Sequence, residues 1–356
     1  MEHINKLDFS GQSIYIGLDV HKKSWSVSIF SEQCEHKTFT QPPEADKLVH
    51  YLKHNFPGAA YQAVYEAGFS GFWAHDQLRK QGVNCLVTNP ADIPTTDKER
   101  TRKRDRTDCR KLARSLRSGE LKGIYVPSRP KLEDRSLVRT RQSMVRKQTR
   151  CKNQIKALLY FYGINLPEEV ADSHWSQKFL GYLENLPMER SSGNMTLKVH
   201  LDELHHLKRI IASLNRSIIL LSREAEYGEM VRLLKTVPGI STLTAMIFLT
   251  ELGDLARFAS LDQLASYVGL IPDIESSGET EHIKNITHRR NPQLRASLIE
   301  AAWVAARKDP VLLLAFNEYC QRMKKTRAII KIARKLLNRI RYVLKNHVAY
   351  VPGVVQ

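Results

Sequence analysis

The sequence lacks the features that mark secreted, disulfide-bonded or membrane-spanning proteins. Its five cysteines, an odd number, are scattered over 356 residues without a CxxC pair, which indicates reduced thiols and neither a disulfide framework nor a zinc site. No apolar run approaches the roughly 20 residues that a membrane-spanning helix needs. The first residues, MEHINK, lack the basic-then-apolar pattern of a secretory signal. We therefore expect a cytoplasmic protein with no membrane partner.

The chain also has far fewer acidic than basic residues. The chain has 37 Asp and Glu against 55 Lys and Arg, which gives a formal net charge of +18. Such an excess favours a polyanionic partner, because each neutralised phosphate releases condensed counterions. The charge therefore predicts a protein that binds nucleic acid, and a length of 356 residues suits two domains or three small ones. The sequence has no internal repeat and no low-complexity stretch.

The region from 13 to 118 alternates strand-like and helix-like segments. Short apolar or alternating stretches predict strands at 14–19, 24–30, 35–41, 60–65 and 83–87. Helices are expected after Pro43, at 71–79 and near 107–116. This order is typical of an α/β sheet covered by helices, and we place this domain at residues 10–120.

The rest of the chain is predicted to be mainly helical. Long amphipathic patterns at 135–159 and 198–225 predict two helices within a region at 130–228. The second pattern is close to a heptad, so the helices are expected to form a helical hairpin or an intermolecular coiled coil. Residues 163–187 and 188–193 are expected to form the connection. A C-terminal domain at 230–346 begins with LKTVPGIS, a helix-hairpin-helix-like pattern of the kind that grips phosphate through exposed amides. Helices at 242–252, 261–268, 292–307 and 326–345 are expected to complete it, whereas the polar residues 275–279 predict a loop.

Four carboxylates form the candidate chemical site. Asp19 and Glu66 end two apolar strands, and Asp105 and Asp108 lie three residues apart, a spacing that would place both on one face of a helix if the helix began before Asp105. Carboxylates that converge from separate elements can hold Mg²⁺ ions that bracket a reacting phosphate. The last two acids lie in a segment, 98–114, with nine basic and three acidic residues. Spacing alone leaves a metal site and a structural, ion-paired role equally open.

Several motifs together resemble a known family. They are YIGLDVHK at 15–22, YEAG at 65–68, KRDRTDCRKLA at 103–113, TVPGI at 236–240, ASYVGLIP at 265–272, SG at 277–278, LR at 294–295 and ARKLL at 333–337. In this order they resemble the DEDD transposases, insertion-sequence recombinases that are related to the Piv DNA invertase and include bridge-RNA-guided recombinases. The resemblance spans nearly the whole chain.

The resemblance implies a fold, an activity and a further residue. The N-terminal domain is expected to be RuvC-like, an RNase H fold, with Asp19, Glu66, Asp105 and Asp108 as its catalytic, metal-binding acids and Mg²⁺ or Mn²⁺ as the cofactor. A long-helix segment and a mainly α C-terminal domain are expected to follow. The family's catalytic serine corresponds to Ser277, with Ser276 as the neighbouring alternative. The implied reaction is attack of Ser277 on a DNA phosphate, which forms a phosphoserine link.

Basic residues near these motifs are expected to contact nucleic acid. Arg135, Arg139, Arg146 and Arg150 lie on one stripe of a helix, where they would repel one another unless a polyanion lay along them; a solvated helix face is the alternative. The full set of expected contacts is Arg102, Lys103, Arg104, Arg135, Arg139, Arg146, Arg150, Arg289, Arg290, Lys331 and Arg334.

The family resemblance also implies partners. It implies donor and target DNA, a structured non-coding guide RNA, a dimer that forms a tetramer when it holds both DNAs, and a nucleoid-associated protein of a bacterial cytoplasm. An endonuclease or junction resolvase of the RuvC type, which hydrolyses DNA without a serine link, is the alternative function.

Overall fold

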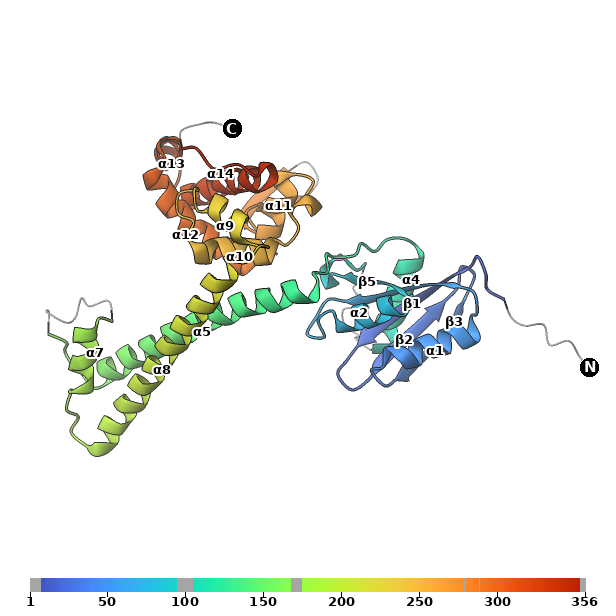
Figure 1. Cartoon of the computed structure of the whole chain (residues 1–356), viewed down its shortest axis with the longest axis horizontal. Helices are drawn as coiled ribbons and strands as arrows, with labels where there is room; N and C mark the ends of the chain where they lie inside the picture. The colour runs from blue at the N-terminus through green and yellow to red at the C-terminus, as the bar shows by residue number, and fades with distance from the viewer. Residues whose placement is uncertain (1–7, 95–104, 168–174, 278–279, 288, 353–356) are drawn as a thin grey trace, which may run out of the picture. The chain divides into compact units, whose positions relative to one another are not determined.

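The computed structural model describes residues 8–94, 105–167, 175–277, 280–287 and 289–352, although the side chains of residues 105–106, 273–277 and 280–285 are outside that description. The chain divides into two compact units, Met1–Val126 and Pro127–Gln356, which we call unit 1 and unit 2 (Figure 1). The division into three domains that we expect from the sequence stays a prediction. None of the described helices is long and apolar enough to cross a membrane.

Unit 1 is built on a five-stranded sheet with the order β3-β2-β1-β4-β5. Its strands are β1 (Ser13–Val20), β2 (Trp25–Phe30), β3 (Glu35–Gln41), β4 (Ala60–Glu66) and β5 (Asn84–Thr88). The first three strands are antiparallel to one another, whereas β4 lies parallel to both β1 and β5. The α/β class predicted for this region is confirmed, and each predicted strand lies within one or two residues of an observed one.

Helices cover both faces of this sheet. On one face, α1 (Ala45–Asn55) and α2 (Trp73–Lys80) enclose a core that contains Ile14, Ile16 and Leu18 of β1. On the other face, α4 (Asp105–Arg117) packs its buried Leu112 against Val64 of β4. Successive residues of a strand point to opposite faces, so the central strands are apolar on both sides. A single 3₁₀ turn, η1 (Pro90–Asp92), follows β5.

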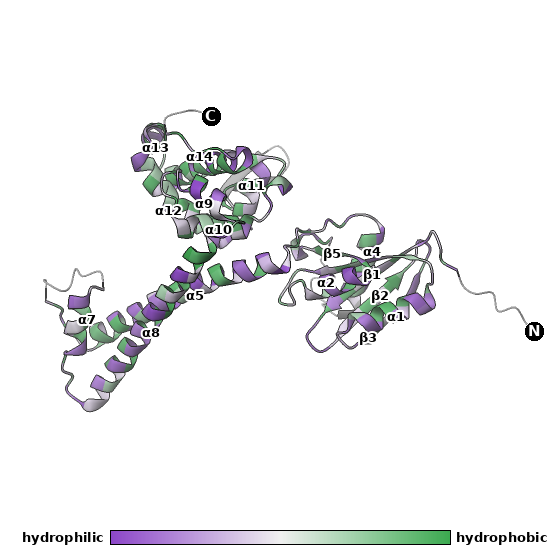
Figure 2. Ribbon diagram, viewed as in Figure 1, coloured by the Kyte–Doolittle hydropathy of each residue, from purple (hydrophilic) through white to green (hydrophobic). Residues whose placement is uncertain are grey.

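Unit 2 begins with a long helical hairpin. Its two arms, α5 (Arg129–Phe161) and α8 (Ser191–Leu221), lie side by side and bury leucine, isoleucine and cysteine side chains between them (Figure 1). Purple and green alternate along both arms in Figure 2, as expected of helices with one apolar side. Of the two arrangements predicted, the hairpin within one chain is therefore confirmed. The connection between its arms contains a helix that the sequence analysis missed, α7 (Gln177–Glu184).

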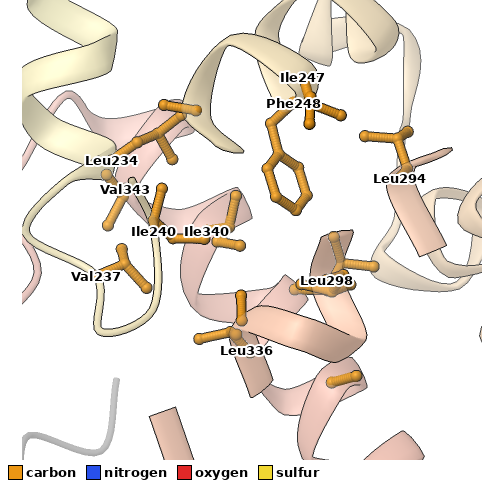
Figure 3. Close-up of a cluster of buried hydrophobic side chains, with 14 of the residues drawn as sticks. Leu234, Val237, Ile240, Ile247, Phe248, Leu294, Leu298, Leu336, Ile340 and Val343 are labelled. Carbon is orange, nitrogen blue, oxygen red and sulfur yellow. The ribbon is translucent and has the colours of Figure 1, made fainter. Parts of the chain in front are cut away.

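The remainder of unit 2 is a helical cluster around one apolar core. It contains α9 (Gly228–Leu234), α10 (Thr242–Leu252), η2 (Leu255–Arg257), α11 (Leu261–Val268), α12 (Pro292–Lys308), α13 (Pro310–Arg322) and α14 (Lys325–Asn346). Side chains from α9, α10, α12 and α14 meet in this core (Figure 3). The turn between α9 and α10 contains Gly239, whose φ is +88° and whose Cα lies against the backbone of Ala301.

Two elements of this cluster differ from the expectation. Residues 275–277, predicted as loop, belong to a strand, because β6 (Pro272–Ser277) pairs with β7 (Thr280–Ile286) in an antiparallel hairpin. The helix α13 was not predicted, although Asp309 accepts hydrogen bonds from the amides of Val311 and Leu312 at its start. The predicted helices 242–252, 261–268, 292–307 and 326–345 are confirmed to within one residue.

Candidate active site

The register of the central strands brings two of the predicted acids together. In the parallel pair of β1 and β4, Leu18 is opposite Tyr65, and Asp19 and Glu66 are the next residue on each strand. Residues in register on adjacent strands point to the same face of the sheet. That face is the one covered by α4, because Val64, two residues before Glu66, packs against Leu112 of that helix. Asp19 and Glu66 are thus neighbours at the carboxyl ends of two parallel strands.

A close contact between α4 and β1 positions the third acid. Gly17, two residues before Asp19, lies so near α4 that a Cβ atom there would be 1.9 Å from the carbonyl oxygen of Cys109. Asp108 is the residue before Cys109 and is one turn from the buried Leu112, so it lies near the sheet-facing side of α4. The absence of a side chain at Gly17 therefore lets α4 bring Asp108 close to the strand that carries Asp19.

The surroundings of Asp19 mix polar and aromatic groups. His21 Nε2 lies 3.1 Å from Asp19 Oδ2, and the His21 ring is 6.2 Å from the ring of Phe69, a largely exposed side chain. Burial, with a smaller contribution from the negative charge of Asp19, raises the pKa of the Cys109 thiol to about 11. Cys109 is thus a neutral, buried neighbour of the carboxylates at physiological pH.

The fourth acid lies at the limit of what the structure describes. Asp105 is the first residue of α4, and its side chain is outside the described part of the chain. Among the described side chains, no group of three or more His, Cys, Asp or Glu could hold a metal ion. The donor set still suits a hard cation, since Asp19 and Glu66 offer carboxylate oxygens on one face of the sheet and Asp108 offers another from α4.

Ser277 is in unit 2, at the end of the β6–β7 hairpin. It is the last residue of β6 and is paired with Thr280, while Ser276 is paired with Glu281; neither serine side chain is described. Hydrogen bonds join the base of the hairpin to the helical cluster. Thr287 N donates to Ile271 O at 3.1 Å, and the Arg295 guanidinium on α12 donates to Thr287 O at 3.0 Å.

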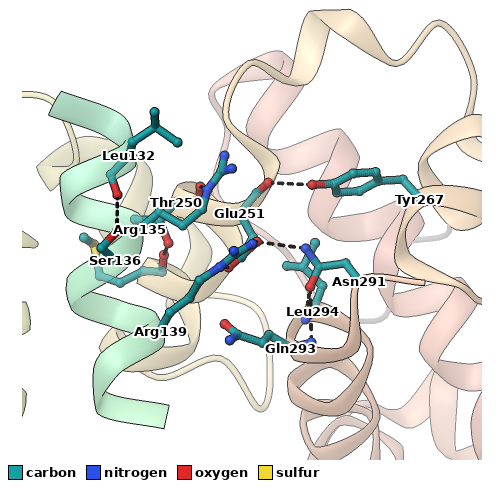
Figure 4. A network of polar contacts seen from close by, with 11 residues as sticks. Leu132, Arg135, Ser136, Arg139, Thr250, Glu251, Tyr267, Asn291, Gln293 and Leu294 are labelled. Atoms are coloured by element: carbon teal, nitrogen blue, oxygen red, sulfur yellow. Dashed lines mark hydrogen bonds and ion pairs between the residues drawn. The ribbon is translucent and has the colours of Figure 1, made fainter. Parts of the chain in front are cut away.

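Glu251, a buried glutamate, accepts hydrogen bonds from three elements near that hairpin: α5, α11 and the start of α12 (Figure 4). Glu251 is fully buried near the end of α10 and accepts two hydrogen bonds from the Arg139 guanidinium, at 2.6 and 2.7 Å. Asn291 Nδ2 donates to Glu251 Oε2 at 2.8 Å, and Tyr267 OH donates to Glu251 O at 3.1 Å. Burial raises the pKa of Glu251, but the hydrogen bonds from Arg139 and Asn291 and the nearby positive charges outweigh it, so the pKa is lowered.

This cluster was missed by the sequence analysis, and it changes the interpretation of the arginine stripe. A single acid in an otherwise apolar helix, TLTAMIFLTEL, was the signal available. Arg139 binds Glu251, and Arg135 Nε donates to Thr250 O at 2.8 Å. The first half of the stripe therefore contacts groups of the chain itself, an arrangement that the sequence analysis did not predict. Arg146 and Arg150, farther along α5, are exposed.

The other predicted basic contacts have varied surroundings. Arg102, Lys103 and Arg104 lie outside the described residues. Arg289 and Arg290 are exposed beside the start of α12. On α14, Lys331 Nζ lies 5.0 Å from the centre of the Tyr319 ring, and Arg334 forms an ion pair with Asp262. Nucleic-acid binding by these residues stays a prediction.

Two family models match the chain. A DEDD transposase model of the IS110 type, described as "Transposase", matches residues 16–164, and a model described as "Transposase IS116/IS110/IS902 family" matches residues 231–316. The first match contains Asp19, Glu66, Asp105 and Asp108, and the second contains Ser277 and the α9–α10 turn.

Curated relatives are similar to the chain along most of its length. The putative transposase y4qE of Sinorhizobium fredii is 31% identical over 239 residues, which are 67% of this chain and 57% of that protein. The putative transposase y4rJ of the same organism is 27% identical and covers 91% of this chain and 90% of its own length. The transposase for insertion sequence element IS1533 of Leptospira borgpetersenii is 24% identical, with coverages of 82% and 85%. The chain thus spans less than two thirds of the first of these relatives.

Proposed function

Because the chain belongs to the IS110/IS116 family of DEDD transposases, we propose that it cuts and rejoins DNA at a site formed by Asp19, Glu66, Asp105, Asp108 and Ser277. The DNA would be the ends of an insertion sequence and its target. The observation that carries the proposal is the pair of acids on adjacent parallel strands, Asp19 and Glu66, on the face covered by the helix that contains Asp108.

The strand order supports assigning unit 1 to the RNase H-like, RuvC-like fold. The order β3-β2-β1-β4-β5 combines an antiparallel meander with parallel β1, β4 and β5, and this is the arrangement expected of that fold. In such a sheet the carboxyl ends of the central parallel strands lie at one edge. This edge is where Asp19 and Glu66 lie, so the proposed fold and the proposed site require the same geometry.

Mg²⁺ or Mn²⁺ is the proposed cofactor, and Asp19, Glu66, Asp108 and Asp105 would hold it. When bound, such ions stabilise negative charge on the reacting phosphate and on the leaving oxygen. His21 contacts one oxygen of Asp19 and so orients that carboxylate. Gly17 keeps α4 close enough to the sheet for Asp108 to contribute. The contribution of Asp105 rests on its position at the start of α4.

Ser277 would provide the nucleophile for rejoining. Its Oγ forms a bond to phosphorus as the bond between phosphorus and one DNA oxygen breaks, and the serine proton ends on that leaving oxygen. Attack by a DNA hydroxyl on the phosphoserine then reverses the step, so no other reactant is consumed. The carboxylates belong to unit 1 and Ser277 belongs to unit 2, and the proposed assembly is a dimer or tetramer.

Paired substitutions distinguish this reaction from hydrolysis. We expect Asp19→Asn and Ser277→Ala both to abolish the covalent protein–DNA product on a labelled insertion-sequence end, measured on a denaturing gel. Ser276→Ala is the matched control and should retain the product. A nuclease that hydrolyses DNA would still release cut strands after Ser277→Ala. Recombination that survives Asp19→Asn would rule out the proposed carboxylate site.

A guide RNA is the second part of the proposed function. The net charge of +18 and the exposed Arg146 and Arg150 on the hairpin support binding of a second polyanion besides DNA. Sequencing the RNA that co-purifies with the chain, expressed beside its flanking non-coding DNA, is expected to yield one discrete species from that DNA. We expect Arg146→Gln with Arg150→Gln to reduce its recovery several-fold. A random sample of cellular RNA would contradict guidance by RNA.

A further inference from the structure

An open groove crosses unit 2 where the helical hairpin meets the helical cluster. It has a volume of about 550 Å³ and is lined by Ile219, Ser222, Arg223, Gly228, Val231, Arg232, Lys235, Thr236 and Thr242. Its walls are the end of α8, the helix α9 and the start of α10. None of the nine lining residues is acidic, whereas three are cationic. We call it the α9 groove.

The three cations of the α9 groove are available to a ligand. Arg223, Arg232 and Lys235 are exposed, and Arg232 and Lys235 are one turn apart on and just after α9. Within the described part of the chain, no ion pair of these three side chains is found. Two nearby acids are occupied elsewhere, because Glu226 pairs with Lys131 and Glu229 with His347.

The frame that presents these cations is rigid. Val231 and Leu234, on the other side of α9, are buried in the core, and Ser222 is buried at the end of α8. The turn between α9 and α10 is fixed by Gly239, whose backbone lies against Ala301. The backbone positions that carry the three cations are therefore set by the fold.

The start of α10 adds hydrogen-bond donors. The first amides of a helix have no partner within that helix. Ser241 Oγ accepts from the Thr244 amide at 3.2 Å, and this leaves the amides of Thr242 and Leu243 for a ligand or water. Thr242 lines the groove, so the start of α10 lies beside the cations. Together they suit the oxygens of successive phosphates.

We infer that the α9 groove binds the phosphate backbone of duplex DNA, and this inference rests on the proposed function, in which DNA is the substrate. The groove is open and has no acid in its lining, as expected for contact with a long polyanion. Arg223 follows the end of α8, whereas Arg232 and Lys235 are on and just after α9, so the charges come from two segments, which suits several phosphates along a strand. Its contacts are to backbone phosphates, so they would position DNA without selecting its sequence.

The test is the salt dependence of DNA binding by the full-length chain. A variant with Arg223→Gln, Arg232→Gln and Lys235→Gln is compared with a matched control, Lys53→Gln, Lys80→Gln and Lys308→Gln, which removes three exposed charges elsewhere. The probe is a short fluorescein-labelled DNA duplex of arbitrary sequence, measured by anisotropy without divalent metal. We expect the groove variant to bind about 10- to 100-fold more weakly near 0.1 M salt, with a salt slope shallower by about 2 to 3. The control should behave like the parent chain.

Each other outcome overturns the inference. If the groove variant has the same salt slope as the parent chain, the groove does not contact DNA phosphates. If both triple variants lose the same affinity for the duplex, the cause is the lower net charge and not the groove. A loss confined to a labelled RNA duplex would assign the groove to RNA. Thermal melting excludes misfolding of either variant. Asp19→Asn should bind the duplex normally without cutting it. Duplex binding therefore tests the groove, whereas DNA cleavage tests the proposed function, and either can fail without the other.

Discussion

Replacing Gly17 with alanine is expected to destabilise unit 1 by about 3–5 kcal/mol, at the upper end of what a single substitution does. An alanine Cβ would be 1.9 Å from Cys109 O and 2.5 Å from Ala113 N. Both are backbone atoms in the middle of α4, so no side chain can rotate away. The whole helix would have to move by more than an ångström to restore ordinary contact, and it would break the packing of Leu112 on Val64 as it moved.

Hydrogen exchange measured by mass spectrometry can follow this effect within the full chain. Amides of β1 and α4 should exchange much faster in the Gly17→Ala chain, while amides of α10 and α12 in unit 2 should keep their protection. Gly68→Ala is the matched control, since nothing lies within 4 Å of a Cβ there. Equal protection of β1 in both variants would mean that α4 does not approach the sheet as closely as described.

The same substitution has a consequence for catalysis. Asp19 is two residues after Gly17, and Asp108 directly precedes Cys109, whose carbonyl oxygen would clash with the new methyl group. Any shift of α4 that accommodates the methyl group separates Asp108 from Asp19. We therefore expect the Gly17→Ala chain to lose DNA cleavage even under conditions where it remains folded. The glycine in YIGLDVHK thus serves the proposed site through packing.

The strands of unit 1 could be predicted because their burial leaves a clear pattern. Apolar runs such as 14–18 are largely buried, and their ends coincide with acids or turn residues. The parallel pairing of β1 with β4, which makes neighbours of Asp19 and Glu66, depends on contacts between distant segments. Spacing in the sequence showed that two strands end in acids, but the register had to come from the fold.

The elements that were missed carry weaker or competing signals. The helix α7 is short and contains Gly181, a poor helix former. The strand β6 has the sequence PDIESS, which lacks the alternation that predicts a strand. The helix α13 does begin with an Asp-Pro pair, a recognised start signal, which was overlooked. Glu251 and its two arginines come from segments more than 100 residues apart, so no local pattern could reveal their pairing.

Replacing Glu251 with alanine is expected to destabilise unit 2 by about 2–4 kcal/mol. The substitution leaves the Arg139 guanidinium and the Asn291 amide without their shared acceptor. The penalty is below that of a fully buried pair, because the Arg139 side chain is 51% exposed and regains water. Glu251→Gln keeps the shape but not the charge and should cost about half as much. Glu229→Ala, which removes an exposed ion pair with His347, is the control and should cost less than about 0.5 kcal/mol.

The pH dependence of these variants identifies the charge as the cause. The pKa of Glu251 is lowered in the folded chain, so its charged form contributes stability above its ordinary pKa of 4.5, and the contribution is lost as the pH falls through the folded value. The difference in unfolding free energy between the parent chain and Glu251→Gln should therefore be constant near neutral pH and shrink below about pH 4.5. Urea unfolding at several pH values measures it. A difference that does not change with pH would show that packing, and not the ion pair, explains the loss.

The effect of Glu251 should extend to the serine hairpin. Asn291, which donates to Glu251, also accepts hydrogen bonds at 3.1 Å from the amides of Gln293 and Leu294 and so begins α12. It follows the strand β7 closely, and its own amide donates to Tyr267 O at 3.0 Å. Loss of Glu251 frees this residue, and with it the base of the hairpin that carries Ser277. We expect Glu251→Ala to reduce the covalent DNA product several-fold while duplex binding stays unchanged. A full yield of that product would show that the buried cluster stabilises unit 2 without positioning the serine.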